Sequence, residues 1–283
     1  MKSGFVAIIG RSNVGKSTLL NALVGSKVAI TTPKPQTTRQ PIQGVITTKE
    51  GQAVIVDTPG IMQKAGDPLT KRLLQYAKDS LQEVDAILYV VDPTRSVGDE
   101  EKQAFKLIEH CTQPKLLVIN KMDDKDARRY VDYYRDLASK FDAYAEVSAD
   151  TGSNVDMVIK WIFEQLREGE LMYPEFQVTN QSNETWLAEL IREKLFLRLR
   201  EEVPYSTHVE VEEISKRKDG TTYVKAVVYT SQERYKRMII GAGGRGIKEI
   251  GQSTRRELEA VTNSKYYLDL SVAVDSHWLE KLT

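Results

Sequence analysis

The loop at residues 10–17, GRSNVGKS, constrains the fold more than any other part of the chain. Two glycines five positions apart, followed by lysine and serine, are the pattern of a phosphate-binding loop. In such a loop backbone N–H groups point at phosphate oxygens, the lysine reaches the β- and γ-phosphates, and the serine hydroxyl binds Mg²⁺. The apolar run FVAII precedes the loop, and the helical pattern STLLNALVG follows it. The sequence therefore predicts a nucleoside triphosphate at the N-terminus of a helix.

The segment INKMD (119–123) indicates which base the nucleotide carries. It begins at the end of the apolar run KLLVI (115–119). The Asp123 carboxylate can accept hydrogen bonds from N1–H and the exocyclic amine of guanine, whereas adenine has no such pair of donors. The tripeptide SAD (148–150) would place the N–H of Ala149 against guanine O6. We therefore predict a guanine-specific pocket.

The segment DTPG (57–60) follows another apolar run, QAVIV (52–56). We expect Asp57 to hold Mg²⁺ through water and the N–H of Gly60 to contact the γ-phosphate.

The segment PQTTRQP (35–41) is rich in proline and threonine and has no hydrophobic period. This composition is expected of a loop that becomes ordered around a γ-phosphate. Either Thr37 or Thr38 would give the metal a hydroxyl ligand, and we favour Thr38, which precedes Arg39.

The first part of the chain alternates strand and helix patterns. Apolar strand runs occur at 5–9, 52–56, 86–91, 115–119 and 143–147. The alternation predicts an α/β fold, a mostly parallel sheet with helices on both faces. A further strand at 44–49 would pair antiparallel with 52–56, and a helix at 154–166 would close the domain. We place the GTPase domain at 1–170, a linker at 171–184, and a second domain at 185–283.

The second domain has a different order of elements. We expect a helix at 185–202, a hairpin of strands at 207–214 and 221–230, a short helix, a glycine loop, a helix from about 245, and a strand at 266–274. This α+β order, with Gly241-Ala242-Gly243-Gly244 in the loop, resembles a type II KH domain.

The glycine loop suits RNA. Without side chains at Gly241 and Gly244, a nucleic-acid backbone can lie against the peptide and the next helix. Seven basic residues against one acid, Glu249, surround the loop in a chain whose formal net charge is zero. The basic residues are Arg234, Lys236, Arg237, Arg245, Lys248, Arg255 and Arg256. We predict RNA binding by these residues and by 241–244, and interpret KRK (216–218) as a solubilising turn.

The segments PQTTRQ, DTPGI and NKMD, together with the KH-like domain, resemble the Era family of ribosome-assembly GTPases over nearly the whole chain. The sequence departs from the family's pattern at Ser12, where proline is usual, and its last segment, DSHWLEKLT, ends earlier than the resemblance leads us to expect. The resemblance implies GTP, GDP and Mg²⁺ as ligands, small-subunit rRNA near its 3′ end as partner, and a role in small ribosomal subunit assembly. It also implies a cytoplasmic location with some peripheral membrane association, and we expect a monomer.

The nucleotide-site residues that these motifs predict are Gly10, Arg11, Ser12, Asn13, Val14, Gly15, Lys16, Ser17, Asp57, Thr58, Pro59, Gly60, Asn120, Lys121, Asp123, Ser148 and Ala149. Ser17, Thr38 and Asp57 are the predicted metal ligands. Lys16, Thr38, Gly60 and Asn13 are the predicted catalytic residues.

The position after Gly60 bears on the rate of hydrolysis. Ras-type GTPases place a water-orienting glutamine there, whereas this chain has Ile61, which has no polar group. Unassisted turnover should therefore be slow, on the order of 10⁻⁴ to 10⁻² s⁻¹. Related GTPases with asparagine at the position of Asn13 use a potassium ion near the phosphates. The alternative is that Asn13 only braces the loop.

Three other functions fit parts of the sequence. A nucleotidase whose second domain merely packs would retain no RNA through residues 185–283. An RNA-binding protein with a vestigial nucleotide site would not turn GTP over. An RNA-modification GTPase would need a catalytic partner site, and no motif in this sequence indicates one. No apolar run approaches the ~20 residues of a membrane span, and the single Cys111 is expected to serve packing.

Overall fold

A computed structural model of the chain describes residues 1–34, 37–38, 41–60 and 75–278. They form two compact units, Met1–Asn180 and Gln181–Thr283, and each unit is described by itself.

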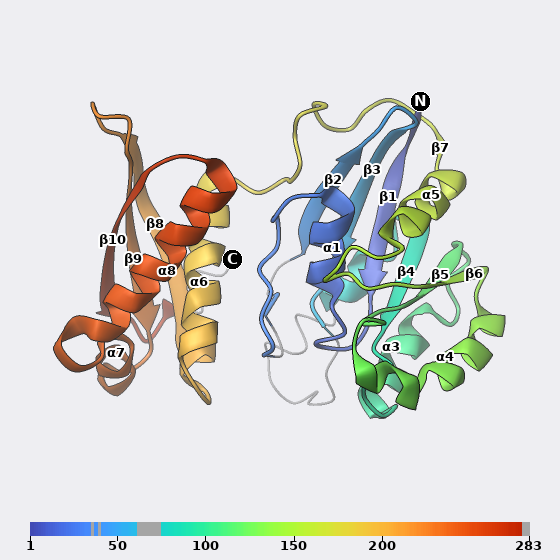
Figure 1. The fold of residues 1–283 in the computed structure, drawn as a ribbon, viewed down its shortest axis with the longest axis horizontal. Helices are drawn as coiled ribbons and strands as arrows, with labels where there is room; N and C mark the ends of the chain where they lie inside the picture. Colours follow the sequence, from blue (N-terminus) through green and yellow to red (C-terminus); the bar gives the residue numbers. More distant parts are fainter. Residues whose placement is uncertain (35–36, 39–40, 61–74, 279–283) are drawn as a thin grey trace. The chain divides into compact units, whose positions relative to one another are not determined.

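The first unit contains a sheet in the order β2-β3-β1-β4-β5-β6, with β7 (Arg167–Glu168) antiparallel to the start of β1 (Figure 1). Strands β1, β3, β4, β5 and β6 pair in parallel, and β2 pairs antiparallel with β3. Their bounds are β1 Lys2–Ile9, β2 Ile42–Thr47, β3 Gly51–Asp57, β4 Ala86–Val91, β5 Lys115–Ile119 and β6 Ala143–Glu146. The predicted mostly parallel sheet is confirmed, with the antiparallel strand two residues earlier than expected.

Helices cover both faces of this sheet because the strands alternate their side chains. In β1, Val6 and Ile8 pack with residues of α1 (Lys16–Val24) and α5 (Val155–Gln165). Ala7 and Ile9 face the opposite way, toward α3 (Asp99–Ile108) and α4 (Val131–Leu137). Strands apolar on both faces are typical of parallel sheets. The carboxyl ends of β1, β3 and β5 then lead directly into the three nucleotide motifs.

Residues 172–178, expected to lie in the linker, are bonded to the first sheet. The side-chain oxygen of Gln52 accepts hydrogen bonds from the N–H groups of Met172 and Tyr173, at 2.8 and 2.9 Å. The N–H of Val45, on β2, donates to the carbonyl of Val178 at 2.9 Å. The segment thus supplies hydrogen-bond partners to the edge strand β2.

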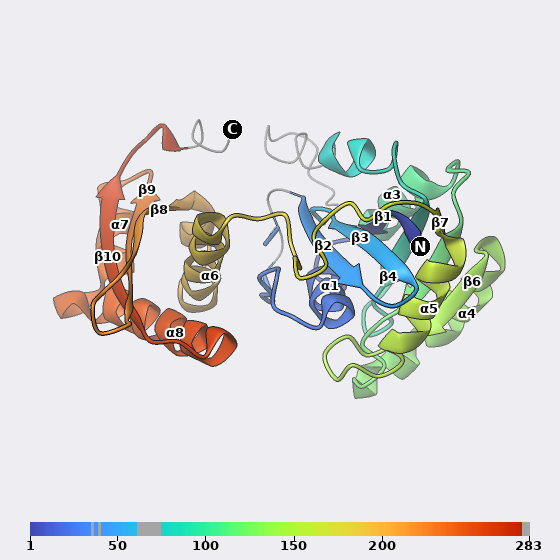
Figure 2. The same ribbon diagram turned by 90° about the horizontal axis from the view of Figure 1, so that it is seen from above.

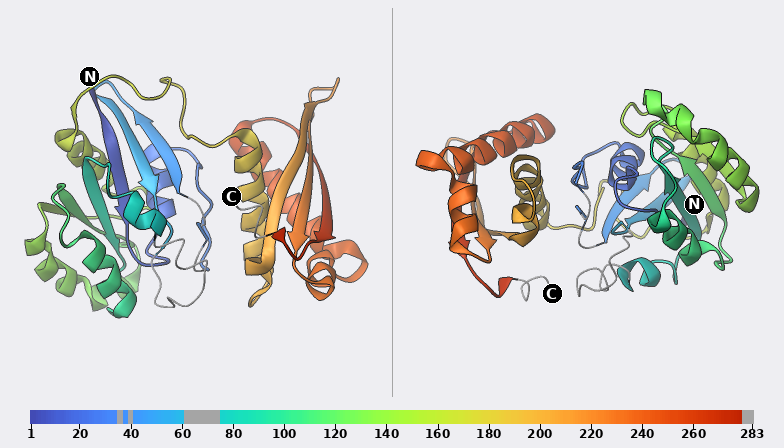
Figure 3. Two further views of the ribbon diagram at one scale, coloured as in Figure 1. Left: turned by 180° about the vertical axis from the view of Figure 1, so that it is seen from behind. Right: turned by 90° about the horizontal axis from the view of Figure 1, so that it is seen from below.

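The second unit contains three strands in the order β10-β9-β8. β8 (Thr207–Lys216) and β9 (Thr222–Thr230) form the antiparallel hairpin, and β10 (Tyr266–Val274) joins β9 in parallel. Helices α6 (Asn183–Arg198), α7 (Glu233–Ile240) and α8 (Arg245–Thr262) share one core with the sheet. Figure 2 shows α6 and α8 beside the sheet, and Figure 3 shows the unit from behind and from below.

Helix α6 begins and ends earlier than the predicted 185–202. Ser182 caps its N-terminus, with the hydroxyl accepting a hydrogen bond from the N–H of Thr185. Leu199 is extended, and Val203–Ser206 form a separate 3₁₀ turn that contains Pro204. The apolar period of the sequence therefore continues past the end of the helix. Within the described ranges, no helix is both long and apolar enough to cross a membrane.

Candidate nucleotide site and GxxG surface

The two glycines of the phosphate loop are required because other parts of the chain lie close to them. A Cβ at Gly10 would lie 2.4 Å from the carbonyl oxygen of Val90, on β4. Gly15 has φ +96°, and a Cβ there would lie 2.3 Å from the side-chain nitrogen of Asn120. The glycines therefore permit both the curled backbone and the close approach of the guanine motif.

Lys16, at the start of α1, turns back over this loop. It is buried, and its Nζ donates to the carbonyls of Gly10 and Arg11 at 3.2 and 3.1 Å. Burial lowers the pKa of Lys16, and the carboxylates of Asp57 and Glu101 oppose that shift. A buried cation at the N-terminus of a helix that follows a glycine loop is the environment that a polyphosphate requires.

Three oxygens from three segments meet beside Lys16. The hydroxyl of Ser17 donates to Asp57 Oδ2 at 2.6 Å and lies 3.1 Å from Thr38 Oγ1. The hydroxyl of Thr38 lies 3.4 Å from the same carboxylate oxygen. Burial raises the pKa of Asp57, against the charge of Lys16 and the hydrogen bonds of Ser17 and Thr38. The other oxygen, Asp57 Oδ1, is buried without a hydrogen-bond partner among the described residues. Hydroxyl and carboxylate oxygens so arranged fit Mg²⁺.

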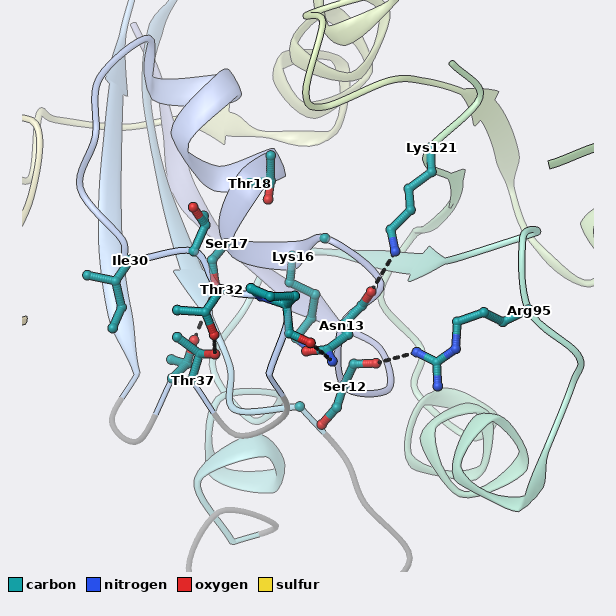
Figure 4. A pocket seen from close by; sticks show the side chains of 15 residues that line it. Ser12, Asn13, Lys16, Ser17, Thr18, Ile30, Thr32, Thr37, Arg95 and Lys121 are labelled. Atoms are coloured by element: carbon teal, nitrogen blue, oxygen red, sulfur yellow. Dashed lines mark hydrogen bonds between the residues drawn. The ribbon is translucent and has the colours of Figure 1, made fainter. Parts of the chain in front are cut away.

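Thr37 and Thr38, in the loop before β2, have different hydrogen-bond partners. Thr37 Oγ1 lies 2.7 Å from Thr32 Oγ1 and donates to the carbonyl of Lys34 at 2.8 Å (Figure 4). Thr38 instead is buried beside Ser17 and Asp57. The geometry therefore favours Thr38 as the metal ligand.

Asn120 joins the phosphate loop to the base-binding motifs. Its amide nitrogen donates to the carbonyl of Val14 at 2.9 Å, and its amide oxygen accepts from the N–H of Ala149 at 2.9 Å. Lys121 Nζ donates to the carbonyl of Asn13 at 2.9 Å. Asp123 is exposed beside them, where a base can reach its carboxylate.

The segment after β3 closes against the phosphate loop. The hydroxyl of Thr58 donates to the carbonyl of Ile8 at 2.7 Å, and Pro59 is buried. A Cβ at Gly60 would lie 2.6 Å from Ser12 Oγ, so only glycine fits there. Ile61 lies outside the described residues.

Arg11, predicted to bind nucleotide, directs its side chain away from the cavity. Its guanidinium is buried, with Nε 3.0 Å from Glu101 Oε2. Glu101 also accepts hydrogen bonds from the hydroxyls of Tyr89 and Tyr134, at 2.5 and 3.3 Å. Only the backbone of Arg11 is placed to meet phosphate. This network was not predicted from the sequence, because Glu101 is one of three acids in the first turn of α3 and acids are common at that position in any helix.

Asp92, at the end of β4, was also missed. Lys121 Nζ lies 2.7 Å from Asp92 Oδ2, and the N–H and hydroxyl of Thr94 donate to Oδ1 at 2.9 and 2.6 Å. Burial acts to raise the pKa of Asp92, but these bonds outweigh it and the pKa is lowered. The ionised carboxylate thus fixes both Lys121 and the turn after β4.

A cavity of about 490 Å³ lies over these elements (Figure 4). Its lining comprises Ser12, Asn13, Gly15, Lys16, Ser17, Thr18, Ile30, Thr31, Thr32, Pro33, Thr37, Thr38, Gly60, Arg95 and Lys121. Six of these residues were not predicted from the sequence: Thr18, Ile30, Thr31, Thr32, Pro33 and Arg95.

The second candidate site is the glycine loop between α7 and α8. Gly241, Gly243 and Gly244 have φ values of 72°, 60° and 75°. Nothing lies within 4 Å of a Cβ placed at Gly243 or Gly244, so these positions face open space. A Cβ at Gly246, a residue the sequence did not single out, would lie 2.4 Å from the carbonyl of Ile239. This close packing fixes the angle at which α8 leaves the loop.

The predicted basic residues differ in their surroundings. Lys248 and Arg255 line a groove of about 420 Å³ between α8 and β10, which also contains the apolar Ile247, Leu268 and Leu270. Arg234 instead bonds to Glu202 at 3.2 Å and to the hydroxyl of Tyr235 at 2.8 Å. Of the other members, Arg237, Arg245 and Arg256 are exposed, and Lys236 is half-buried.

The acid in this patch has its own partner. Arg198, from α6, lies 2.9 Å from Glu249, which partly offsets the single negative charge counted beside the loop.

Comparison with known proteins gives the same two-part division. Residues 5–121 match the family described as 50S ribosome-binding GTPase, and residues 202–279 match the KH domain. The chain is 44% identical over 283 residues to GTPase Era of Carboxydothermus hydrogenoformans, covering 99% of this chain and 95% of the relative. It belongs to the Era family of GTPases. GTPase Era of Halothermothrix orenii is 42% identical over 281 residues, with 99% and 95% of the two chains covered.

Two solved Era structures resemble the whole chain. One is Aquifex aeolicus Era, as a point variant bound to GDP·AlF4⁻, with TM-score 0.90, 37% identity, and 98% and 95% of the two chains covered. The other is Era in complex with MgGDPNP and nucleotides 1506–1542 of 16S ribosomal RNA, with TM-score 0.89, 36% identity and the same coverage.

Proposed function

We propose that this chain binds and hydrolyses GTP and uses the nucleotide state to control its binding to small-subunit rRNA near the 3′ end, during assembly of the small ribosomal subunit. The observation that carries the proposal is the link through Asn120, which bonds to both Val14 of the phosphate loop and Ala149 of the base loop. Era relatives that match both units of this chain, one of them solved with MgGDPNP and 16S rRNA, support it.

In this proposal each nucleotide motif has a separate task. The N–H groups of the loop and the Lys16 ammonium hold the β- and γ-phosphates, and the Gly60 N–H meets the γ-phosphate. Ser17 and Thr38 would ligate Mg²⁺, with Asp57 holding it through water; the cation, when bound, offsets phosphate charge. Asp123 and the Ala149 N–H select guanine, with Ser148 shaping the base loop.

A potassium ion at Asn13 is a further part of the proposal. The amide nitrogen of Asn13 donates to the carbonyl of Pro33 at 2.8 Å, which turns the amide group toward the loop that precedes Thr38. The amide oxygen is the atom that would ligate potassium. The same hydrogen bond equally supports the bracing role, and the two are separated by hydrolysis rates in potassium and in sodium at equal ionic strength.

The KH unit supplies the RNA contacts in this proposal. Phosphates would lie over 241–244 at the N-terminus of α8, where the backbone and the helix dipole favour negative charge. Bases would enter the groove rimmed by Lys248 and Arg255, whose apolar floor suits stacked rings. Arg245, Lys236, Arg237 and Arg256 add local positive potential, and Arg234 would first have to leave Glu202.

The remaining proposals concern the setting in which the protein acts. We propose that it works as a monomer in the cytoplasm, where its ribosomal partner is assembled, with peripheral association at the inner face of the membrane. Sedimentation with and without RNA, and fractionation of cells, test these points.

One experiment tests the proposed function as a whole. The purified chain is given GTP and a 3′-terminal 16S rRNA fragment, and GTP turnover and RNA retention are measured together, with a scrambled RNA as control. We expect slow GTP-specific turnover and retention of the native RNA alone. Turnover without retention would indicate a nucleotidase, and retention without turnover a vestigial nucleotide site.

A further inference from the structure

The turn after β4 brings an arginine to the wall of the nucleotide cavity. Arg95 lines the cavity together with Ser12, Asn13 and Gly60, and its Nη1 lies 3.5 Å from the carbonyl oxygen of Ser12 (Figure 4). Ser12 and Gly60 mark the γ-phosphate end of the site, because the Gly60 N–H is the group expected to meet that phosphate. The guanidinium is therefore at the end of the cavity where the bond is broken.

The backbone that carries Arg95 is held by the nucleotide motifs themselves. The buried guanidinium of Arg11 donates to the carbonyls of Ser96 and Asp92, at 2.9 and 3.4 Å. Asp92 in turn bonds to Thr94 and to Lys121, as described above. The turn is thus fixed both to the phosphate loop and to the guanine motif, so that little reorganisation is needed to present Arg95.

Arg95 also differs from the neighbouring cations in lacking a carboxylate partner among the described residues. Arg11 is paired with Glu101, and Lys121 is paired with Asp92. Among the described residues, no carboxylate lies within ion-pair distance of Arg95, and its side chain is exposed. Its charge is therefore available to an anion that enters the cavity.

We propose that Arg95 is a catalytic residue that the chain supplies to its own GTP site, where its guanidinium contacts the γ-phosphate. The proposal rests on the GTPase function proposed above. In the reaction the oxygen of water bonds to Pγ, the bond from Pγ to the β–γ bridging oxygen breaks, and the electron pair remains on GDP. The water gives up a proton to phosphate or solvent. Negative charge shifts toward the bridging oxygen, and a fixed guanidinium stabilises it.

The sequence has a specific need for such a group. Ile61 cannot orient the attacking water, so charge stabilisation has to supply a larger share of the rate. Arginines in this role contribute roughly 10³- to 10⁵-fold in other GTPases. Arg95 is exposed and screened by solvent, so we expect a smaller contribution, about 10- to 100-fold.

The test compares Arg95→Ala, Arg95→Lys and the control Arg129→Ala, which removes an exposed arginine paired with Asp126 on the surface of the same unit. Single-turnover GTP hydrolysis is measured together with the affinities for GDP and for GDP with aluminium fluoride. We expect Arg95→Ala to slow hydrolysis about 10- to 100-fold and to weaken GDP–aluminium fluoride, while GDP affinity changes less than about twofold. Arg95→Lys should be intermediate, and Arg129→Ala should match the unmodified chain.

Two results would overturn the proposal. Hydrolysis by Arg95→Ala within about twofold of the unmodified rate would show that the guanidinium does not act on the reaction. A parallel loss of GDP affinity would show that Arg95 only braces Ser12. Absence of GTP turnover in the unmodified chain is a separate outcome, and it would refute the proposed function itself.

Discussion

The nucleotide site and the glycine loop of the second unit both depend on glycines, but for opposite reasons. In the nucleotide site the space that a Cβ would need is filled by protein: Asn120 lies against Gly15, and Ser12 against Gly60. At Gly243 and Gly244 that space is open. The first glycines let the chain approach itself, and the second let another molecule approach the chain.

The two regions also differ in how their charges are held. In the first unit, Lys121 and Arg11 have carboxylate partners, and Asp57 is shared by two hydroxyls. On the second unit, Lys248 and Arg255 line an open groove. A pre-organised site selects one small ligand, whereas an open basic groove can follow a flexible strand.

The largest effect is expected at Gly15. Gly15→Ala puts a methyl group 2.3 Å from the Asn120 amide at φ +96°, which displaces either the loop or the guanine motif. We expect GTP affinity to fall by more than about 100-fold, since both halves of the site shift. Gly25→Ala is the matched control, because Gly25 has φ +73° with nothing within 4 Å of its Cβ position. It should cost about 1–2 kcal/mol of stability and leave GTP affinity intact. Equal losses in a calorimetric GTP titration would refute the steric explanation.

The second prediction concerns RNA. Gly244→Asp places a side chain and a negative charge where the phosphates should lie, and we expect about a 100-fold loss of RNA affinity with no change in GTP affinity. Gly220→Asp is its control, since Gly220 is also at positive φ (84°), in open space, at the hairpin turn. A filter-binding assay in which a folded Gly244→Asp variant retains full RNA affinity would refute the proposed contact between RNA and the glycine loop.

The third prediction concerns the base. Asp123→Asn removes a charged acceptor for two guanine donors, and hydrogen bonds to charged groups contribute roughly 1.5–3 kcal/mol. GTP should therefore bind about 10- to 100-fold more weakly, while xanthosine triphosphate should bind better, because the amide complements its altered edge. Competition by ATP as effective as that by GTP, in the unmodified chain, would show that the pocket is misassigned.

The smallest effect is on stability. Because burial raises the pKa of Asp57, the unfolded state gains more from ionisation, and the free energy of unfolding falls as the pH rises above the ordinary aspartate range. Asp57→Asn should therefore raise the melting temperature of the nucleotide-free protein at pH 7, with the gain disappearing at acid pH. It should also weaken nucleotide binding that depends on Mg²⁺. An unchanged or lowered melting temperature would contradict the burial argument.

Local patterns in the sequence predicted most of the helices and strands, and they predicted the site residues that belong to consecutive motifs. The runs at 86–91, 115–119 and 266–274 coincide with β4, β5 and β10. Runs of this length and composition, bounded by turn residues, are typical of strands. The phosphate loop and guanine motif were predicted because their chemistry resides in consecutive residues. Pairings across the fold were not predictable. Nothing near Glu101 indicates that it binds Arg11, and nothing near Arg95 indicates that it reaches Ser12, since both contacts exist only after β1 and β4 have paired.

In the proposed function, the nucleotide in the first unit controls RNA binding by the second. Its most direct test is the affinity of the full chain for the 3′-terminal 16S rRNA fragment, measured with saturating GDP and with a non-hydrolysable GTP analogue at the same salt concentration. We predict tighter RNA binding with the analogue, by about 5- to 150-fold if the coupling has the usual size, and an equal gain in analogue affinity when RNA is bound. Equal RNA affinity in the two nucleotide states would contradict the account, because it would leave two independent binding sites on one chain.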